Sequence, residues 1–201
     1  SYEGRIVSVD QNQIIVDLHK QISESAESPI KIRLFQGLAK GDKLDLVIQK
    51  AVELGVSEVY PFSSQHSVVK LTDDKKSQRQ KRWQKIAYEA GKQCKRDLIP
   101  EIYEPIDFKS LITKIGFNSD NHLILMPYEH ATGFGLKQLA GATPSSVDIV
   151  IGPEGGFSEA EVDSVQQLGG QIITLGRRIL RTETAAIATL AMVQLLWGDI
   201  G

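Results

Sequence analysis

This sequence has little cysteine and no long apolar run, and each of these features excludes some classes of protein. Its single cysteine, Cys94, excludes an internal disulfide framework and any metal site built from several cysteines. One cysteine in 201 residues is also typical of the reducing cytoplasm. No apolar run approaches the ~20 residues of a membrane-spanning helix, and residues 1–10 lack the pattern of a signal peptide. We therefore expect a cytoplasmic protein without a membrane segment.

Neither sign of charge is in large excess. The chain has 23 basic and 25 acidic residues and a formal net charge of -2, so no global attraction to nucleic acid or membranes is expected. The distribution is uneven, however. Between residues 70 and 96, the acidic residues Asp73, Asp74 and Glu89 are outnumbered by Lys70, Lys75, Lys76, Arg79, Lys81, Arg82, Lys85, Lys92, Lys95 and Arg96. Such a run forms either a solvated helix face or a surface for RNA phosphates, and the residues alone leave both open.

The usual phosphate-binding and metal-binding patterns are also missing. There is no GxxxxGK[ST] motif, no GxGxxG motif follows a strand, and the GFG at 133–135 lacks the rest of that fingerprint. The four histidines belong to no HExxH pattern, so we predict no metal site. These absences weaken the reading of the chain as a Rossmann-type enzyme that depends on a nucleotide.

Apolar strands and amphipathic helices alternate along most of the chain. Three strand-like segments come first, at 4–9, 13–20 and 30–35, and we expect them to form a small β domain. The segments expected to be helical are 42–55, 77–94, 158–168 and 184–197, and the expected strands are 56–62, 122–127, 147–151 and 171–175. This alternation predicts an α/β domain with a mainly parallel sheet.

The motif IGPEGGFSEAEV places a glycine-rich turn directly after an apolar strand. Gly152 and Pro153 turn the chain, and Gly155 and Gly156 leave room for close approach to the backbone. Ligands of open α/β sheets bind at the C-terminal ends of strands, so this loop is either a ligand loop or a turn that simply needs glycine. Because Glu154 would repel a polyphosphate, we expect a ligand with neutral or positive groups, such as an adenosine with an amino-acid or sulfonium part.

A second motif, LGRRILRTETAAIATLAM, connects the last expected strand to the last expected helix. Thr182 or Thr184 can cap that helix, and its alanines give it a slim face. Arg181 lies directly before the helix, where an unpaired guanidinium would be costly unless it faced a ligand or an acid. At least one of Arg177 and Arg178 is expected to lie in a solvated loop.

Five collinear stretches carry a family resemblance. They are KGDKLDLVIQKAVELGVSEVYPF, HSVVK, RWQKIAYEAGKQC, IGPEGGFSEAEV and LGRRILRTETAA. Together they resemble the bacterial small-subunit rRNA (uracil-N3)-methyltransferase family, the RsmE-like branch of the SPOUT superfamily. The likeness runs from about Leu34 to the C-terminus.

The resemblance implies a knotted methyltransferase domain over residues 37–201. It would be an α/β domain with a SPOUT-type parallel sheet and a C-terminal trefoil knot, a topology nearly absent from other proteins. Residues 1–36 would belong to a small PUA-like β-barrel that helps to bind RNA. The family has further strands and an arm before YEGRI, so we expect a truncated barrel. This chain also has Lys95 after Cys94, where the family usually has glycine or a small residue.

The resemblance further implies S-adenosyl-L-methionine as the cofactor, held in the knot by three loops. The matching residues are Leu125, Met126, Pro127, Gly152, Pro153, Glu154, Gly155, Gly156, Leu175, Gly176, Ile179, Leu180, Arg181, Thr182, Thr184 and Ala185. The family is a homodimer with its site near the dimer interface. Its substrate is 16S rRNA, which implies the 30S subunit as the partner here.

The expected reaction is methylation of N3 of a uridine, which must lose its proton and be exposed from pairing. Arg181 is our candidate for stabilising the uracil anion or holding a nearby phosphate. Glu154 is a second candidate, as a contact to the positive end of the cofactor or as a proton acceptor. The candidate RNA contacts are Lys75, Lys76, Arg79, Arg82 and Arg96. The alternative function is a non-catalytic RNA-binding or ribosome-assembly module with the same fold, and the intact glycine loop favours the enzyme.

Overall fold

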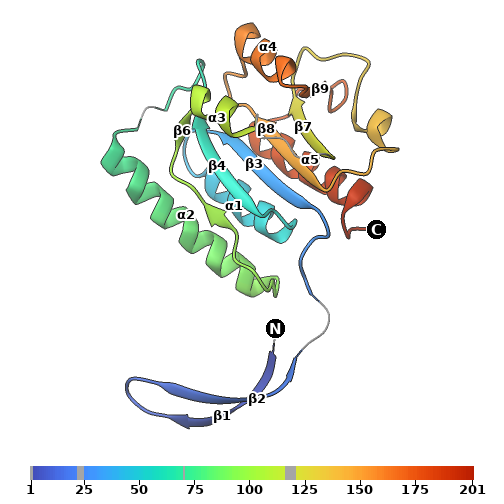
Figure 1. Cartoon of the computed structure of the whole chain (residues 1–201). Coiled ribbons are helices and arrows are strands. Elements are labelled where there is room, and N and C mark those ends of the chain that lie inside the picture. Colours follow the sequence, from blue (N-terminus) through green and yellow to red (C-terminus); the bar gives the residue numbers. More distant parts are fainter. Residues whose placement is uncertain (1, 22–24, 70, 116–120) are drawn as a thin grey trace.

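A parallel β-sheet forms the centre of the protein. The computed structural model describes residues 2–21, 25–69, 71–115 and 121–201. Within these ranges seven strands share one sheet in the order β5-β4-β3-β8-β7-β9, and β6 also pairs with β4 (Figure 1). They are β3 (Lys31–Gly37), β4 (Glu58–Ser63), β5 (Glu101–Ile102), β6 (Ile106–Asp107), β7 (His122–Pro127), β8 (Ser146–Ile151) and β9 (Gln171–Ile173). All the pairs are parallel, as predicted.

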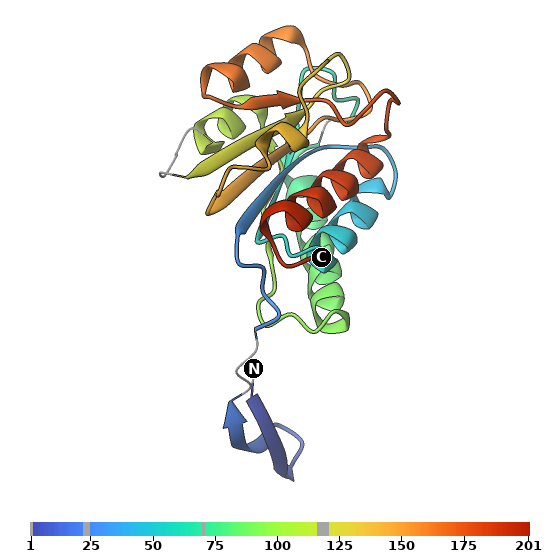
Figure 2. The same ribbon diagram turned by 90° about the vertical axis from the view of Figure 1, so that its right-hand side faces the viewer.

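Helices cover both faces of this sheet (Figure 2). On one face, α1 (Lys43–Glu53), α2 (Asp73–Gln93) and α5 (Thr182–Trp197) pack over a core that includes Leu34, Trp83 and Leu190. On the other face, α3 (Phe108–Ile115) and α4 (Glu159–Gln167) pack over a second core around Phe35 and Phe62. Ile32 and Leu34 of β3 belong to the first core and Phe35 to the second, so this strand is buried on both faces.

Local signals in the sequence set several helix ends. Gly55 ends α1 with a φ of 78°, and Ser158 and Glu161 form a capping box at the start of α4. Helix α2 begins earlier than predicted, because Asp73 and Asp74 suit the positive end of its dipole. Lys95 has a φ of 60°, a conformation that favours glycine, the kind of residue that the family resemblance led us to expect there. Helix α3 was not expected from the sequence.

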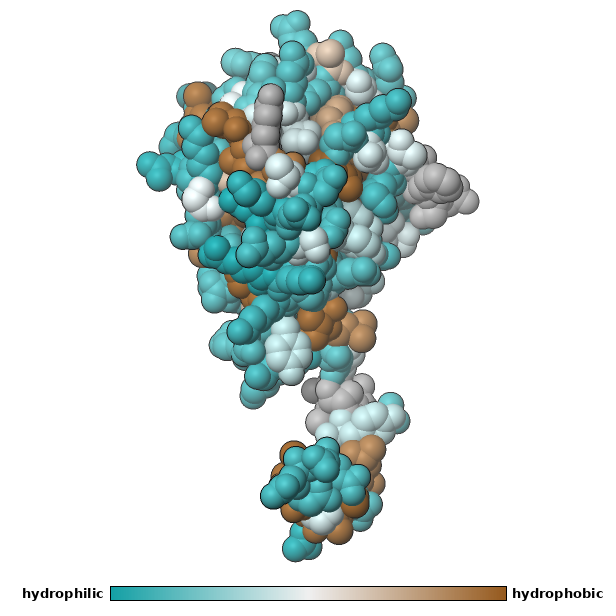
Figure 3. Space-filling model, turned by 90° about the vertical axis from the view of Figure 1, so that its left-hand side faces the viewer, coloured by the Kyte–Doolittle hydropathy of each residue, from teal (hydrophilic) through white to brown (hydrophobic). Residues whose placement is uncertain are grey.

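The N-terminal part of the chain differs from the prediction. Strands β1 (Tyr2–Val9) and β2 (Ile14–Gln21) form an antiparallel hairpin, and all of its residues are exposed, the apolar ones included (Figure 3). The third predicted strand, 30–35, does not join them. As β3 it lies in the middle of the parallel sheet, because its two faces are needed by both cores. The antiparallel hairpin is therefore formed by β1 and β2 alone, and β3 belongs to the parallel sheet.

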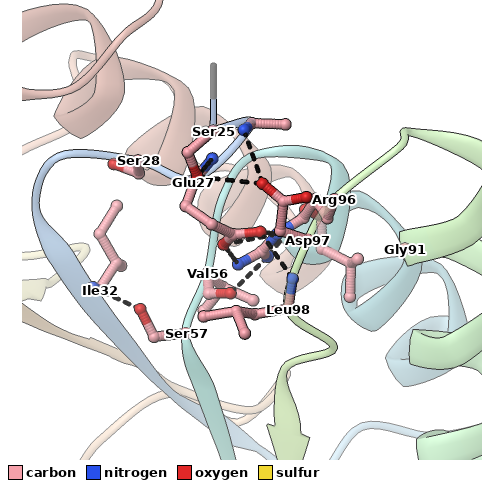
Figure 4. A network of polar contacts seen from close by, with 12 residues as sticks. Ser25, Glu27, Ser28, Ile32, Val56, Ser57, Gly91, Arg96, Asp97 and Leu98 are labelled. Carbon is pink, nitrogen blue, oxygen red and sulfur yellow. Dashed lines mark hydrogen bonds and ion pairs between the residues drawn. The ribbon is translucent and has the colours of Figure 1, made fainter. Parts of the chain in front are cut away.

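Residues 25–28, here called the strap, lead from the hairpin to β3 and are held by polar contacts (Figure 4). The hydroxyl of Ser25 donates to Asp97 Oδ2 at 3.1 Å, and the N–H of Leu98 donates to Glu27 Oε1 at 3.0 Å. Ser28 donates to Gln194 of α5 at 3.0 Å. The strap is thus fastened to the segment after α2 and to the last helix.

Arg96 is the central residue of this fastening. Its side chain is 6% exposed and forms an ion pair with Glu27 of the strap. The guanidinium also donates to the carbonyl oxygens of Val52 at 3.2 Å and Val56 at 2.6 Å, at the end of α1 and in the turn before β4. Every branch of the guanidinium is therefore used inside the protein, which removes Arg96 from the predicted RNA-binding surface.

We predict that Arg96→Met destabilises the protein by on the order of 3 kcal/mol, because it leaves a partly buried Glu27 carboxylate and two carbonyl groups without their donor. Urea unfolding followed by circular dichroism measures this change. Lys92→Met is the matched control, since Lys92 and Glu89 pair with their side chains 57% and 58% exposed and such pairs contribute about 0.5 kcal/mol. Equal stability of the two variants would contradict the role of Arg96.

Candidate ligand site at the carboxyl edge of the sheet

A cavity of about 420 Å³ lies where β7, β8 and β9 end. Its walls come from the loops that follow these three strands and from the start of α5. The carboxyl edge of a parallel sheet is where ligands of this fold class bind. The lining residues are Lys43, Pro127, Tyr128, Glu129, Ile151, Gly152, Pro153, Glu154, Gly156, Phe157, Thr174, Leu175, Gly176, Arg177, Arg178, Ile179, Leu180, Arg181, Thr182 and Ala185.

Most of the residues predicted to hold a ligand line this cavity. They come from all three predicted loops, although these loops are far apart in the sequence. Four predicted residues do not line it. Leu125 and Met126 are fully buried in the two cores, and the side chain of Thr184 is exposed on α5. Gly155 points toward the neighbouring loop instead of the cavity, because a Cβ built on it would lie 2.7 Å from the carbonyl oxygen of His66.

The glycine loop is a tight turn held at several points. The N–H of Gly156 donates to the carbonyl oxygen of Pro153 at 3.0 Å, and Gly156 has a φ of 68° that other residues rarely adopt. The carbonyl oxygen of Gly155 lies 3.1 Å from Nδ1 of His66. The two glycines therefore have different tasks: Gly156 makes the turn, and Gly155 lets the 64–67 loop pack against it.

Thr182 joins the three parts of the site. Its hydroxyl donates to the carbonyl oxygen of Gly152 at 2.6 Å and accepts a hydrogen bond from Nε2 of Gln36 at 2.9 Å. Gln36 is fully buried at the end of β3, and Thr182 is 7% exposed. This chain of hydrogen bonds ties β3, the loop after β8 and the start of α5 together. The prediction that Thr182 or Thr184 caps α5 was wrong: Arg181 occupies the N-cap position, and the Thr182 hydroxyl serves the glycine loop.

Glu154 anchors the tip of the glycine loop to the start of α1. Its carboxylate accepts hydrogen bonds from Nζ of Lys43 at 2.8 Å and from the N–H of Lys40 at 3.1 Å. Burial acts to raise the pKa of Glu154, but the hydrogen bonds from Lys43 and from the backbone outweigh it, and the pKa is lowered. A carboxylate with a lowered pKa is a poor proton acceptor, so its geometry suits an anchor better than a general base.

The cavity carries more charged groups than the motifs suggested. Arg177, Arg178 and Arg181 all line it, from the segment between β9 and α5. Glu129 lines it from the loop after β7, with its side chain 40% exposed. Sequence reasoning missed Glu129 and Lys43. Glu129 could have been predicted from its position two residues after an apolar strand. Nothing in the sequence indicated that Lys43 contacts Glu154.

The basic face of α2 is partly committed to ion pairs. Lys76 pairs with Asp73 at 2.8 Å, and Arg82 pairs with Asp42 and Asp45 of the α1 region. Lys75 is exposed, and Arg79 lies over the ring of Trp83. Hydrophilic side chains cover this side of the molecule (Figure 3). Lys70 lies outside the described residues.

Comparison with known proteins gives a consistent match. A family model for an RNA methyltransferase domain matches residues 26–194. The chain is 37% identical, over 96% of its length and 78% of the relative, to ribosomal RNA small subunit methyltransferase E of Bacillus subtilis. It is 34% identical, over 98% of its length and 76% of the relative, to the protein of that name from Buchnera aphidicola of Acyrthosiphon pisum.

Solved structures agree. The crystal structure of a ribosomal RNA small subunit methyltransferase E from Neisseria gonorrhoeae, bound to S-adenosyl methionine, is similar with a TM-score of 0.86 and 30% identity, and the match covers 100% of this chain and 80% of that one. The methyltransferase Lpg2936 from Legionella pneumophila, in complex with the same cofactor, has a TM-score of 0.85 and 32% identity, with 99% and 80% covered. The Aquifex aeolicus TrmH/SpoU tRNA modifying enzyme shares the fold, with a TM-score of 0.53 and 16% identity over 83% of this chain and 75% of that one.

We predict that Thr182→Val lowers the free energy of unfolding by about 2 kcal/mol, because the carboxamide of Gln36 and the carbonyl of Gly152 lose a buried partner. Thr182→Ser keeps the hydroxyl and is expected to cost less than half as much. Urea unfolding of both variants measures the difference. A valine variant as stable as the serine variant would show that the hydroxyl does not hold the loop.

Glu154→Gln is expected to lower the melting temperature at pH 7 but not under acidic conditions. Because the pKa of Glu154 is lowered in the folded protein, its stabilising effect is complete well above the ordinary pKa of 4.5 and is lost as the pH falls through the lower folded value. Melting curves of both proteins from pH 7 down to pH 3 test this convergence. Asp163→Asn, at an exposed position in the middle of α4, controls for the loss of one negative charge. A constant difference across the range would contradict the anchoring role.

Proposed function

The chain belongs to the ribosomal RNA small subunit methyltransferase E family, and from this premise we propose that it transfers a methyl group from S-adenosyl-L-methionine to 16S rRNA. The acceptor we propose is N3 of a uridine. The observation that carries this function is the cavity between the three strand-end loops, in a chain whose structural relatives bind that cofactor. The proposed setting is the bacterial cytoplasm, with the 30S subunit as the partner.

The cavity has the right chemistry for this cofactor. Ile151, Leu175 and Leu180 offer apolar contacts for an adenosine, and the backbone around Gly152 can approach a ligand closely. Arg177 and Arg178, between β9 and α5, suit the carboxylate of the methionyl part, and Glu129 suits its ammonium group. The absence of a phosphate-binding motif agrees with a cofactor that has no phosphate. We propose that the predicted residues which line the cavity, together with Glu129, Tyr128 and Lys43, form its binding site.

The residues of the chain would position the acceptor and stabilise its charge. When bound, the cofactor supplies an electrophilic methyl group on a sulfonium sulfur. As the bond from N3 to the methyl carbon forms, the bond from sulfur to that carbon breaks, and the N3 proton must leave to a base. We propose that Arg181, at the cavity rim, stabilises the uracil anion that results. We propose the anchoring of the glycine loop for Glu154, whose lowered pKa disfavours proton transfer.

The remaining parts of the family architecture are also proposals. Lys75, Lys76, Arg79 and Arg82 on α2 would contact RNA phosphates, and the hairpin would belong to a PUA-like barrel.

A trefoil knot is supported by the path of residues 174–182. Thr174 donates to Phe134 in the loop after β7, and Thr182 then reaches the loop after β8 on the way to α5.

We also propose a homodimer in which α5 contributes to the interface. This helix is apolar on most of its surface, yet Leu195 is 62% exposed and Ile200, just beyond the helix, is 42% exposed. Apolar side chains gathered on one helix are typical of an interface between copies.

The function is tested with the full chain, the labelled cofactor and 30S subunits that lack the modification. Calorimetry is expected to detect cofactor binding, and the label is expected on N3 of one uridine. Binding of RNA without cofactor uptake or methyl transfer would favour the non-catalytic module, and label on another atom would reject the uridine assignment.

Arg181→Ala is expected to lower turnover about 100-fold, the size of effect seen when one donor to a developing anion is removed. Cofactor affinity, measured by calorimetry, should change much less than turnover. Arg181→Lys keeps the positive charge and is expected to recover part of the rate. Wild-type turnover in the alanine variant would rule out the proposed role.

A further inference from the structure

A second hollow lies at the same edge of the sheet and is not explained by the cofactor site. It has a volume of about 570 Å³ and is formed where β4 and β6 end and α3 begins. Leu38 lies on one side, Ser64 and Gln65 on another, and Asp107 and Lys76 at the remaining walls. Its volume is within the range of pockets that hold a small molecule or a single nucleoside.

Among the residues that the structure describes, this hollow and the cofactor cavity have no lining residue in common, but hydrogen bonds join the loops that form their walls. The 64–67 loop lines the hollow and is tied to the glycine loop through His66 and Gly155. The N–H of Gln65 donates to Oε1 of Glu161 at 2.8 Å, and Glu161 also caps α4 directly after the glycine loop. On the other side, Leu38 lines the hollow, while Lys40, two residues further on, holds Glu154 of the cofactor cavity. A ligand in the hollow would therefore lie beside the cofactor loop, in a fixed relation to it.

The lining favours an uncharged heterocycle over a phosphate. Hydroxyl groups of Ser63, Ser64, Ser67 and Ser110 and the amide of Gln65 offer donors and acceptors, and aliphatic side chains complete the walls. Among the described residues of the lining, Lys76 alone is basic, and it is already paired with Asp73 at 2.8 Å. Asp107 adds a negative charge. The hydrogen bonds from the side chain and backbone N–H of Ser110 lower its pKa and keep it ionised at neutral pH.

The hollow is continuous with the basic face of α2. Lys76 lines the hollow and lies in the first turn of α2, and Lys75 and Arg79 lie beside it on the same helix. A nucleic acid whose phosphates followed this face would bring its bases to the mouth of the hollow. Bases of single-stranded RNA are commonly read by hydrogen bonds to their edges after they leave the stack.

We propose that this hollow receives the base of a nucleoside that flanks the methylated one in the RNA substrate. The proposal rests on the proposed function, since it assigns a second contact to the same RNA. It places the acceptor base at the cofactor cavity, its neighbour in the hollow, and the backbone that continues beyond this neighbour along α2.

The experiment uses the full chain and two variants of α3. Ser110→Trp fills the hollow, and Thr113→Trp puts the same side chain on an exposed position of that helix which does not line it. We expect Ser110→Trp to raise the KM for 30S subunits about tenfold, while its melting temperature and cofactor affinity match those of Thr113→Trp. A wild-type KM in Ser110→Trp, or an equal rise in both variants, would overturn the proposal.

A second measurement identifies what the hollow holds, without requiring turnover. Six-nucleotide homopolymers of the four bases, each with one photoactivatable thio-substituted base, are cross-linked to the chain, and the sites are mapped by mass spectrometry. Cross-links at residues 63–67 or 105–110 that Ser110→Trp abolishes would support a base in the hollow. An abasic ribose-phosphate oligomer that competes equally well would show that the hollow binds backbone and would overturn the proposal. If the chain failed to bind cofactor or to methylate RNA, the proposed function would fall, while this cross-link would still report on the hollow.

Discussion

The hydroxyl of Thr182 is the contact on which the geometry of the site most depends. It bonds to Gly152 after β8 and to Gln36 at the end of β3, while its own backbone begins α5. Three segments that are distant in sequence are thereby fixed around one cavity. Gln36 is fully buried and Thr182 is 7% exposed, so loss of one partner would leave buried polar groups unsatisfied. The residue that precedes it, Arg181, is consequently held at the cavity rim by its backbone, while its side chain stays free for a ligand.

Charge is used in two ways around the site. Some groups are fully engaged within the protein: Arg96 holds the strap, and Glu154 joins the glycine loop to α1. Others face the cavity, namely the arginines before α5 and Glu129. Residue type does not separate these two groups, since Arg96 belongs to the first and Arg181 to the second. Burial and the presence of an internal acidic partner do separate them, and these depend on the tertiary structure.

The sequence predicted features that depend on neighbouring residues better than those that depend on distant ones. The capping box of Ser158 and Glu161 and the stop at Gly55 follow from short-range rules, and both are present. The strand at 30–35 was assigned to the N-terminal β unit, because the sequence of an apolar strand does not show which strand it pairs with. Its partner β8 lies more than a hundred residues away in the sequence. The three loops of the site were predicted, but Leu125 and Met126 were included with them. These two residues are still buried within β7, and only the residues after them, from Pro127 on, line the cavity.

The packing of the glycine loop gives a reason for its two faces. One face, with Gly152 and Gly156, lines the cavity, and the other, at Gly155, is pressed against His66 of the 64–67 loop. A side chain at Gly155 would push the 64–67 loop away from the glycine loop. The hollow and the cofactor cavity would then lie farther apart. The glycines that were read as a sign of close ligand approach therefore serve a second contact, between the segment that would hold the cofactor and the segment that would hold the RNA. The contact between His66 and Gly155 would fix the distance between ligands in the two hollows, and such alignment is what methyl transfer between bound partners requires.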